Sequence, residues 1–220
     1  MFNYSLINRT HERLLNMKIY RLTSLILCGA LTLSFAGCTA KPAESSTAKT
    51  EPKTTVTSEV KADNTGDEFV GKYPAFAVTS NSLHNGYWDD VTSNTGDKTN
   101  ASPELSWKPV EGASCYAIYM VDVSANCFLH WVQGDITETT LPEGFAGKEF
   151  YIGAYPPAGS VHQYNIYVIA LKNPVKRVKG SINSRFPEVP EFIKAMETDK
   201  DGNTGNVIAA GKITGLFKGK

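Results

Sequence analysis

The sequence lacks several features that mark common classes of protein. Its 22 basic and 22 acidic residues cancel, so no net charge draws the chain to nucleic acid. Its apolar stretch from Leu22 to Phe35 falls short of the roughly 20 apolar residues that a membrane-spanning helix needs. It contains neither a His-x-His or His-x-x-x-His pair nor a Gly-x-Ser-x-Gly elbow. No nucleic-acid partner, cofactor or metal is therefore expected, and no catalytic residue is assigned.

Residues 1–37 read as an export signal rather than as part of a fold. Lys18 and Arg21 precede the apolar stretch, and two small residues follow it directly before Cys38. The residues before Met17 are polar and unlike such a signal, so Met17 is the expected start of the protein. The segment Phe35-Ala36-Gly37-Cys38 resembles a bacterial lipobox, although Phe stands where Leu is usual. An ordinary signal peptide that is cut nearby is the alternative.

The lipobox resemblance implies that Cys38 carries a diacylglyceryl group and becomes the first residue of the mature protein. Residues 38–67 then form a tether, because Thr, Lys, Ala, Glu and Ser dominate them and large apolar side chains are nearly absent. Two or more acyl chains on one residue give stable anchoring. The expected location is the extracytoplasmic face of the cell membrane, with the lipid at Cys38 as the anchor.

Residues 68–220 are enough for one hydrophobic core, and their pattern is mainly that of β-strands. A helix is predicted from Pro190, with Phe192, Ile193 and Met196 at helical spacing and an end before Asp199. The near-continuous apolar strands predict a sandwich in which central strands are buried on both faces. The predicted strands are 116–123, 128–133, 149–152, 163–171 and 207–214, with long loops at 81–103 and 154–161.

Four polar residues stand out at or near the ends of these apolar strands. The two-residue period of a strand puts Asp122 on the same face as apolar residues of its run, and puts His162 and Tyr164 on one face. His130 is flanked by Phe, Leu, Trp and Val. Each residue alone has an ordinary structural explanation, as a turn residue or a hydrogen-bonded core residue. Together they predict a pocket, because buried polar groups need partners and therefore gather.

Such a cluster fits an oxyanion best. Imidazoles and a phenol donate hydrogen bonds to phosphate or carboxylate oxygens, and a carboxylate beside an imidazole selects its tautomer. Zinc binding and a hydrolase using Ser124 or Ser160 remain open alternatives, both weakened by the missing motifs. The stretch from Asp199 to Gly205 resembles a calcium loop only superficially, because Ala210 stands at the twelfth position, and a solvated turn is expected instead.

Only two cysteines, Cys115 and Cys127, lie in the predicted domain. Export permits a disulfide between them. If the strands that they border form a hairpin, however, the two cysteines lie at its opposite ends, beyond the roughly 6 Å between Cα atoms that a bridge requires. Free thiols are therefore expected.

Several motifs, in order and with similar spacing, resemble those of the phosphatidylethanolamine-binding protein family in its bacterial branch, also called Raf-kinase-inhibitor-like proteins. They span nearly the whole predicted domain. They are Asn100-Ala101-Ser102-Pro103-Glu104-Leu105-Ser106-Trp107, Val121-Asp122-Val123-Ser124-Ala125, Phe128-Leu129-His130-Trp131-Val132, the stretch from Tyr151 to Gly159 with its Pro156-Pro157 pair, His162-Gln163-Tyr164, and the closing segment from Gly205 to Phe217.

The resemblance implies an antiparallel β-sandwich with a large central sheet, a smaller second sheet and one or two short helices. It implies a pocket for small anionic or phosphate-bearing ligands such as phospholipid headgroups. The implied ligand-binding residues, including the four chosen above, are Asp122, His130, Gly153, Tyr155, Pro156, Pro157, His162 and Tyr164.

The departures from the family pattern bear on the ligand. Val123 replaces a Pro, and Ser124 replaces a second Asp, which makes the pocket less negative. Tyr155 replaces a smaller residue and either crowds the mouth or adds a hydroxyl donor, and Asn206 replaces a His. Non-catalytic anion binding is the expected function. A regulator or inhibitor of another surface protein, such as a protease, is the alternative, and an esterase or phospho-hydrolase is weaker.

Overall fold

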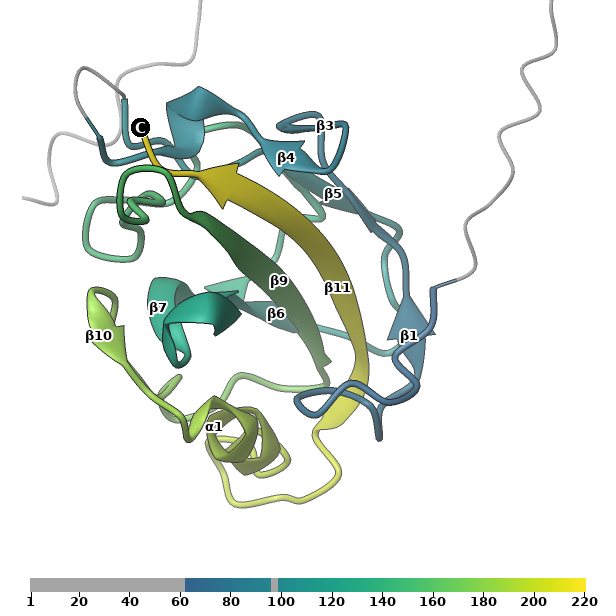
Figure 1. Ribbon diagram of the computed structural model, residues 1–220. Coiled ribbons are helices and arrows are strands. Elements are labelled where there is room, and N and C mark those ends of the chain that lie inside the picture. The colour runs from purple at the N-terminus through teal and green to yellow at the C-terminus, as the bar shows by residue number, and fades with distance from the viewer. Residues whose placement is uncertain (1–61, 96–98) are drawn as a thin grey trace, which may run out of the picture. The chain divides into compact units, whose positions relative to one another are not determined.

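The computed structural model describes residues 62–95 and 99–220, so the signal segment, Cys38 and most of the predicted tether lie outside the described residues. Within these residues the chain forms two β-sheets and few helices (Figure 1). The strands are β1 (Ala75–Phe76), β2 (Val78–Thr79), β3 (Leu83–His84), β4 (Tyr87–Trp88), β5 (Leu105–Trp107), β6 (Cys115–Asp122), β7 (Phe128–Ile136), β8 (Thr140–Leu141), β9 (Val161–Leu171), β10 (Ser184–Arg185) and β11 (Val207–Lys218). The helices are the 3-10 turns η1 (Asp90–Thr92) and η2 (Val123–Ala125) and the α-helix α1 (Val189–Ala195).

The larger sheet has the strand order β10-β7-β6-β9-β11-β4-β3, with β1 also beside β11, and the smaller sheet has the order β2-β5-β8. The long strands β7, β6, β9 and β11 pair antiparallel. The short strands β1 and β4 pair with β11 in parallel. The predicted two-sheet sandwich is confirmed, and its large sheet is mixed rather than wholly antiparallel.

The central strands separate two hydrophobic cores. Alternate residues of β6 face opposite ways: Ile118 and Met120 pack in the core shared with the small sheet, while Tyr119 and Val121 pack in the core beneath α1. Every residue of β6 is buried, as the continuous apolar run predicts. These buried strands form the rigid frame on which the polar residues at the strand ends are held.

The helix α1 forms where helical spacing predicts it. Pro190 sits in its first turn, where a missing backbone N–H costs nothing, and Ile193 is buried in the core beneath it. No helix among the described residues is long and apolar enough to cross a bilayer. The helix therefore covers one core of the sandwich, beside the large sheet (Figure 1).

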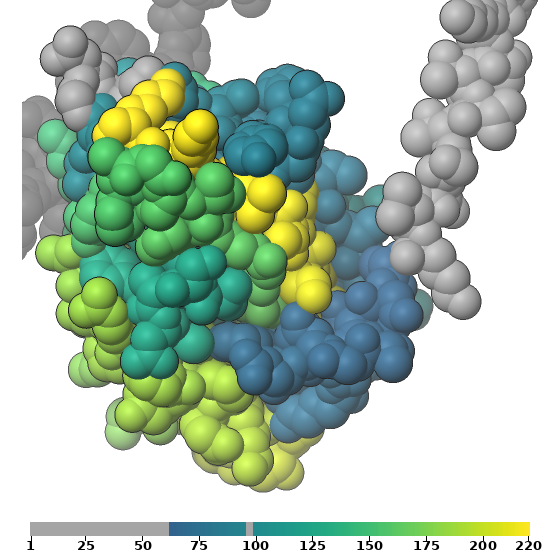
Figure 2. All heavy atoms as spheres, viewed as in Figure 1, coloured from purple at the N-terminus to yellow at the C-terminus, as the bar shows by residue number. Residues whose placement is uncertain are grey.

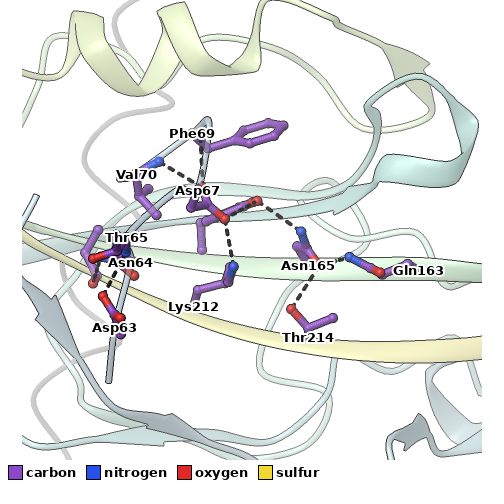
Figure 3. A network of polar contacts seen from close by, with 12 residues as sticks. Asp63, Asn64, Thr65, Asp67, Phe69, Val70, Gln163, Asn165, Lys212 and Thr214 are labelled. Carbon is purple, nitrogen blue, oxygen red and sulfur yellow. Dashed lines mark hydrogen bonds and ion pairs between the residues drawn. The ribbon is translucent and has the colours of Figure 1, made fainter. Parts of the chain in front are cut away.

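A strap of residues 64–73, just before β1, is fastened across the large sheet by a polar network (Figure 3). Asn64 is only 4% exposed and donates to the carbonyl of Ala210 at 2.9 Å. One Asp67 carboxylate oxygen accepts two backbone N–H bonds of the following turn, at 2.9 and 3.0 Å. The other oxygen accepts from Lys212 Nζ at 2.8 Å. Residues 64–67, which composition assigns to the tether, are therefore packed against the domain.

Two of the segment predictions need correction. The run 149–152 is not a strand: residues 148–150 form a turn, and only Tyr151 makes an isolated bridge, to Trp131. The stretch 81–103 is not one long loop, because β3, β4 and η1 lie within it. Pairing between such short segments depends on distant neighbours that local sequence does not reveal.

The turn at Asp199 is less solvated than expected. Its side chain is 5% exposed and accepts bonds from Asn173, from Asn203 and from two backbone N–H groups, which lower the pKa of the Asp199 carboxyl. Asn206 is also buried and bonds the backbone of Asn173 and Met196. Both residues therefore organise the segment between α1 and β11.

The two cysteines of the domain, Cys115 and Cys127, are free and lie near opposite ends of the β6–β7 hairpin.

Candidate anion-binding pocket

One pocket collects the predicted polar residues at the end of the large sheet. Its volume is about 210 Å3, smaller than the ~300 Å3 at which drug-sized sites begin, so it suits a small ligand or one chemical group. In the space-filling view, the green residues that precede and begin β9 lie close to the teal residues of η2 on one face (Figure 2). The lining residues are Asp122, Ala125, Phe128, His130, Tyr155, Pro156, Pro157, His162, Tyr164 and Arg185.

Asp122 and His162 come together because their strands are neighbours. Asp122 is the last residue of β6 and pairs with Tyr164 of β9, two residues from His162. His162 Nδ1 lies 2.7 Å from Asp122 Oδ2, and the Asp122 side chain is only 4% exposed. A carboxylate accepts but cannot donate, so Nδ1 carries the hydrogen and Nε2 is left for a ligand. The structure therefore brings these two residues together at the pocket.

His130 reaches the same pocket through an irregularity in β7. The β6–β7 register shifts between Met120 and Val121, which pair with Trp131 and Leu129, so His130 is the extra residue of a bulge. A bulge lets neighbouring residues share a face instead of alternating. His130 lines the pocket, and Trp131 packs in the core on that side of the sheet. The bulge therefore aims the imidazole at Asp122 and His162, which the sequence pattern alone does not show.

The backbone behind His130 fixes its tautomer. Nδ1 lies 2.8 Å from the carbonyl oxygen of Ile152 and 3.2 Å from that of Gly153, and a carbonyl can only accept, so Nδ1 carries the hydrogen. Burial lowers the pKa of His130, outweighing the carbonyl contacts and the charge of Asp122, which act in the opposite direction. Neutral His130 therefore turns an unprotonated Nε2 toward the pocket.

Two buried polar atoms at this site have no hydrogen-bond partner among the described residues: Asp122 Oδ1 and the Tyr164 hydroxyl. Tyr164 is fully buried, and burial, followed by the charge of Asp122, raises its pKa, so the hydroxyl keeps its hydrogen. Asp122 and Tyr164 are cross-strand partners, and a side-chain interaction with the carboxylate also raises the Tyr164 pKa, although neither atom completes a hydrogen bond of good geometry. An unsatisfied buried polar group costs free energy, and a ligand can remove that cost.

Arg185 is the pocket-lining cation that no sequence pattern predicts. It lines the pocket from β10, donates through Nε to the carbonyl of Ala125 at 3.1 Å, and lies over the ring of Phe128. Its strand reaches β7 only after a connection of residues 172–183. No local motif signals this placement. The one permanent positive charge among the pocket-lining residues therefore comes from a segment that strand periodicity could not assign.

The rim of the pocket is formed by the segment before β9. Tyr155 is 38% exposed, and its hydroxyl donates to Asn183 at 2.8 Å, so it bridges the rim to the segment before β10 rather than filling the pocket. Its ring meets those of Phe128 and His130 edge to face. Pro156 and Pro157 line the opening, as predicted.

The chain end braces this rim from outside. Gly219 exchanges two backbone hydrogen bonds with it, receiving one from Gly159 at 3.1 Å and donating one to Ser160 at 2.9 Å. A Cβ atom at Gly219 would collide with the carbonyl oxygens of Pro156 and Pro157. The rim therefore depends on close backbone packing against the last residues of the chain.

Gly153 does not line the pocket but supports it. Its carbonyl contacts His130, and a Cβ at this position would lie 2.5 Å from the carbonyl oxygen of Thr92, so the close approach requires glycine. Its N–H donates to Asn100 Oδ1 at 2.5 Å, and Ser102 Oγ accepts from the N–H of Ala146. Asn100, in the motif of residues 100–107, therefore holds the backbone that contacts the His130 imidazole, and it does not line the pocket.

The lining residues include no serine, threonine, cysteine or lysine. Ser124 Oγ accepts from the N–H of Gln163, and Ser160 Oγ donates to the carbonyl of Pro157; neither residue lines the pocket. The described residues also contain no group of three or more His, Cys, Asp or Glu side chains placed to hold a metal ion. What the pocket offers is a set of hydrogen-bonding atoms, one carboxylate and one guanidinium.

Comparison with known proteins supports the reading of the motifs. A family model, Phosphatidylethanolamine-binding protein, matches residues 77–218. The structure is similar to that of YbcL of E. coli, described as a new member of the mammalian PEBP family, with 26% identity, a TM-score of 0.50 and coverage of 66% of this chain and 99% of that chain. It is also similar in fold to a putative PEBP homolog, CT736 of Chlamydia trachomatis, with 21% identity, a TM-score of 0.50 and the same coverages. No curated protein matches the chain.

The chain belongs to the phosphatidylethanolamine-binding protein family, because the family model covers well over half of it. The predicted family and the predicted fold are confirmed.

Proposed function

We propose that this protein is an extracytoplasmic lipoprotein whose sandwich domain binds a small anionic or phosphate-bearing ligand without chemical change. The observation that supports ligand binding is the convergence, in a 210 Å3 pocket, of two imidazoles, a guanidinium and two buried polar atoms that lack partners. A polar cluster that only stabilised the fold would have its buried hydrogen bonds completed within the protein.

Calorimetric titration of the purified chain with phosphate and with acetate tests the proposal. We expect saturable binding of at least phosphate, and its loss in a His130→Ala, His162→Ala double variant. His84→Ala is the matched control, because His84 is an exposed histidine that pairs with Asp89 away from the pocket. Absence of heat with both anions, or binding that persists in the double variant, would contradict the proposal.

Binding without catalysis is favoured by the positions of the hydroxyl groups. Both serines considered as nucleophiles are bonded to backbone groups outside the pocket lining. A panel of generic ester and phosphate-ester substrates should show no turnover above background. Turnover that disappears in His130→Ala would establish a hydrolase instead.

The membrane anchor is proposed from the lipobox-like segment that ends at Cys38. Detergent phase partitioning of the protein expressed in a bacterial host tests it directly. The native chain should enter the detergent phase, and Cys38→Ser should remain in the aqueous phase. Aqueous partitioning of both would exclude lipidation.

A further inference from the structure

The connection between β9 and β10, residues 172–183, carries positive charge that the rest of the described chain does not neutralise. Lys176, Arg177 and Lys179 are all exposed. No acidic side chain of the described residues forms an ion pair with any of the three. Basic and acidic residues cancel over the whole sequence, so this is a local excess. Like charges so close together repel one another, and an anionic partner would relieve that repulsion.

A groove of about 560 Å3 lies beside this connection, with more than twice the volume of the anion-binding pocket. The three cations line it together with Phe186 and Phe192, and its lining contains no acidic residue. The two rings are half-buried and pack against each other with their centroids 5.5 Å apart. The groove therefore combines positive charges with an apolar surface, which suits a partner that is both acidic and apolar.

Buried groups hold the connection in place. The hydroxyl of Tyr119, a fully buried residue, donates to the carbonyl of Lys179 at 2.6 Å. Gly180 follows with a φ of 92°, and a Cβ atom there would lie 2.8 Å from the Leu129 side chain and 3.3 Å from the Phe192 ring. Because the backbone is fixed against the core, a partner that binds the groove has little of it left to order.

The backbone of the connection also has donors available. None of the N–H groups of residues 175–182 donates to another group of the described residues. Carboxylates and peptide carbonyls are the acceptors that such N–H groups bind in other proteins. A peptide with acidic side chains supplies both kinds of acceptor along one length of chain.

We propose that this groove binds an acidic segment of another protein, with its carboxylates on the three cations and one large apolar side chain against Phe186 and Phe192. The inference goes beyond the proposed function and uses no residue of the anion-binding pocket. The chain's own predicted tether does not match, because residues 38–61 contain four lysines and three glutamates. A hollow favours a peptide over a bilayer surface, since a peptide side chain can enter it, whereas bilayers take up apolar groups that protrude.

Fluorescence anisotropy with a synthetic peptide tests the proposal on the full chain. The probe is a dye-labelled peptide in which glutamates flank a central phenylalanine and serine fills the other positions. We expect saturable binding that weakens as salt is added. Replacing the glutamates by glutamine, or the phenylalanine by alanine, should each weaken binding ~10-fold or more. No binding of the glutamate peptide, or equal affinity for its glutamine version, would overturn the inference.

A pair of double variants tests the place of binding. Lys176→Gln with Arg177→Gln should weaken the peptide ~10-fold or more, because both charges line the groove. Lys108→Gln with Lys218→Gln removes the same charge at exposed lysines outside the groove, and should change affinity by less than ~2-fold. Equal weakening by the two pairs would overturn the proposed site. Phosphate binding should be unchanged in both, so a failure here is distinguishable from a failure of the proposed function.

Two other occupants of the groove are tested in parallel. Cosedimentation with vesicles of phosphatidylcholine, with and without phosphatidylglycerol, uses Cys38→Ser so that no acyl chain carries the protein. Vesicle binding that needs the groove cations, without peptide binding, would overturn the inference in favour of an anionic bilayer. Self-association in analytical ultracentrifugation that is lost in the groove double variant would overturn it in favour of a second copy of this chain.

Discussion

Alternate residues of β9 belong to two polar clusters on opposite faces of one sheet. On one face, His162 and Tyr164 point into the pocket, where a buried carboxylate oxygen and the Tyr164 hydroxyl lack partners. On the other face, Asn165 and Tyr167 bond each other, and the network continues to Thr214, Asp67 and Lys212. The second cluster fastens the strap and has no buried side-chain atom without a partner among these residues.

The difference teaches how to tell a binding cluster from a structural one. Both clusters are polar, both are largely buried, and both sit on the same strand. What separates them is whether the protein itself completes the hydrogen bonds. Completed networks stabilise the fold, whereas incomplete ones cost stability, and two of the atoms without partners lie together at the pocket.

Removal of Asp67 should give the largest effect on stability. Asp67→Ala leaves two backbone N–H groups of the strap and the ammonium of Lys212 without their acceptor. We expect a loss of ~2–4 kcal/mol in the free energy of unfolding, measured by urea denaturation. Glu68→Ala is the matched control, since Glu68 is exposed and next in the chain. A loss below ~1 kcal/mol would mean that the strap is not held by this network.

The same substitution on the two faces of β9 should give unequal results. Tyr167→Phe removes a hydroxyl that accepts from Asn165 at 3.0 Å, and should cost ~1–2 kcal/mol. Tyr164→Phe removes a hydroxyl that has no partner, so stability should change by less than ~0.5 kcal/mol while anion affinity falls. Thermal unfolding and calorimetric titration of both variants measure the two effects. Equal losses of stability would erase the distinction between the clusters.

The free energy of unfolding should also depend on pH, because His130 is buried on the pocket face. Burial lowers the pKa of His130 below the ordinary value of 6.5, so the unfolded chain takes up this proton more readily than the folded one. The stability that neutral His130 contributes is present above pH 6.5 and is lost as the pH falls toward the lowered pKa. The slope approaches at most ~1.4 kcal/mol per pH unit.

Urea denaturation between pH 7 and pH 5, with and without phosphate, measures this loss. His130→Gln should flatten the curve in the absence of phosphate, because the titrating ring is gone. Bound phosphate should reduce the loss in the native protein. Identical curves for the native protein and His130→Gln would show that another group carries the pH dependence.

The sequence was sufficient for the frame of the site and for most of its polar residues. The two-residue period put Asp122 on the same face as apolar residues of its own strand, and His162 with Tyr164 on one face of theirs, because a buried strand admits few alternative arrangements. The family resemblance added the proline rim and Gly153. Gly153 supports His130 from behind rather than lining the pocket.

Other features depend on pairing between distant segments. The bulge that turns His130 toward the pocket exists only in the register of β6 against β7. Arg185 reaches the pocket because β10, two residues long, pairs with the far edge of β7. The strap network joins Asp67 to Lys212 across 145 positions of sequence. None of these leaves a local pattern of hydrophobicity or spacing, so the sequence does not predict the positive charge of Arg185 at the pocket.

The packing of Gly219 against Pro156 and Pro157 has a practical consequence for anyone who produces this protein. An affinity tag or reporter fused after Lys220 would begin one residue beyond that contact, beside the rim of the pocket. Ligand measurements made on such a fusion would therefore mix the properties of the tag with those of the site. A cleavable tag on the strap side of the domain avoids the problem.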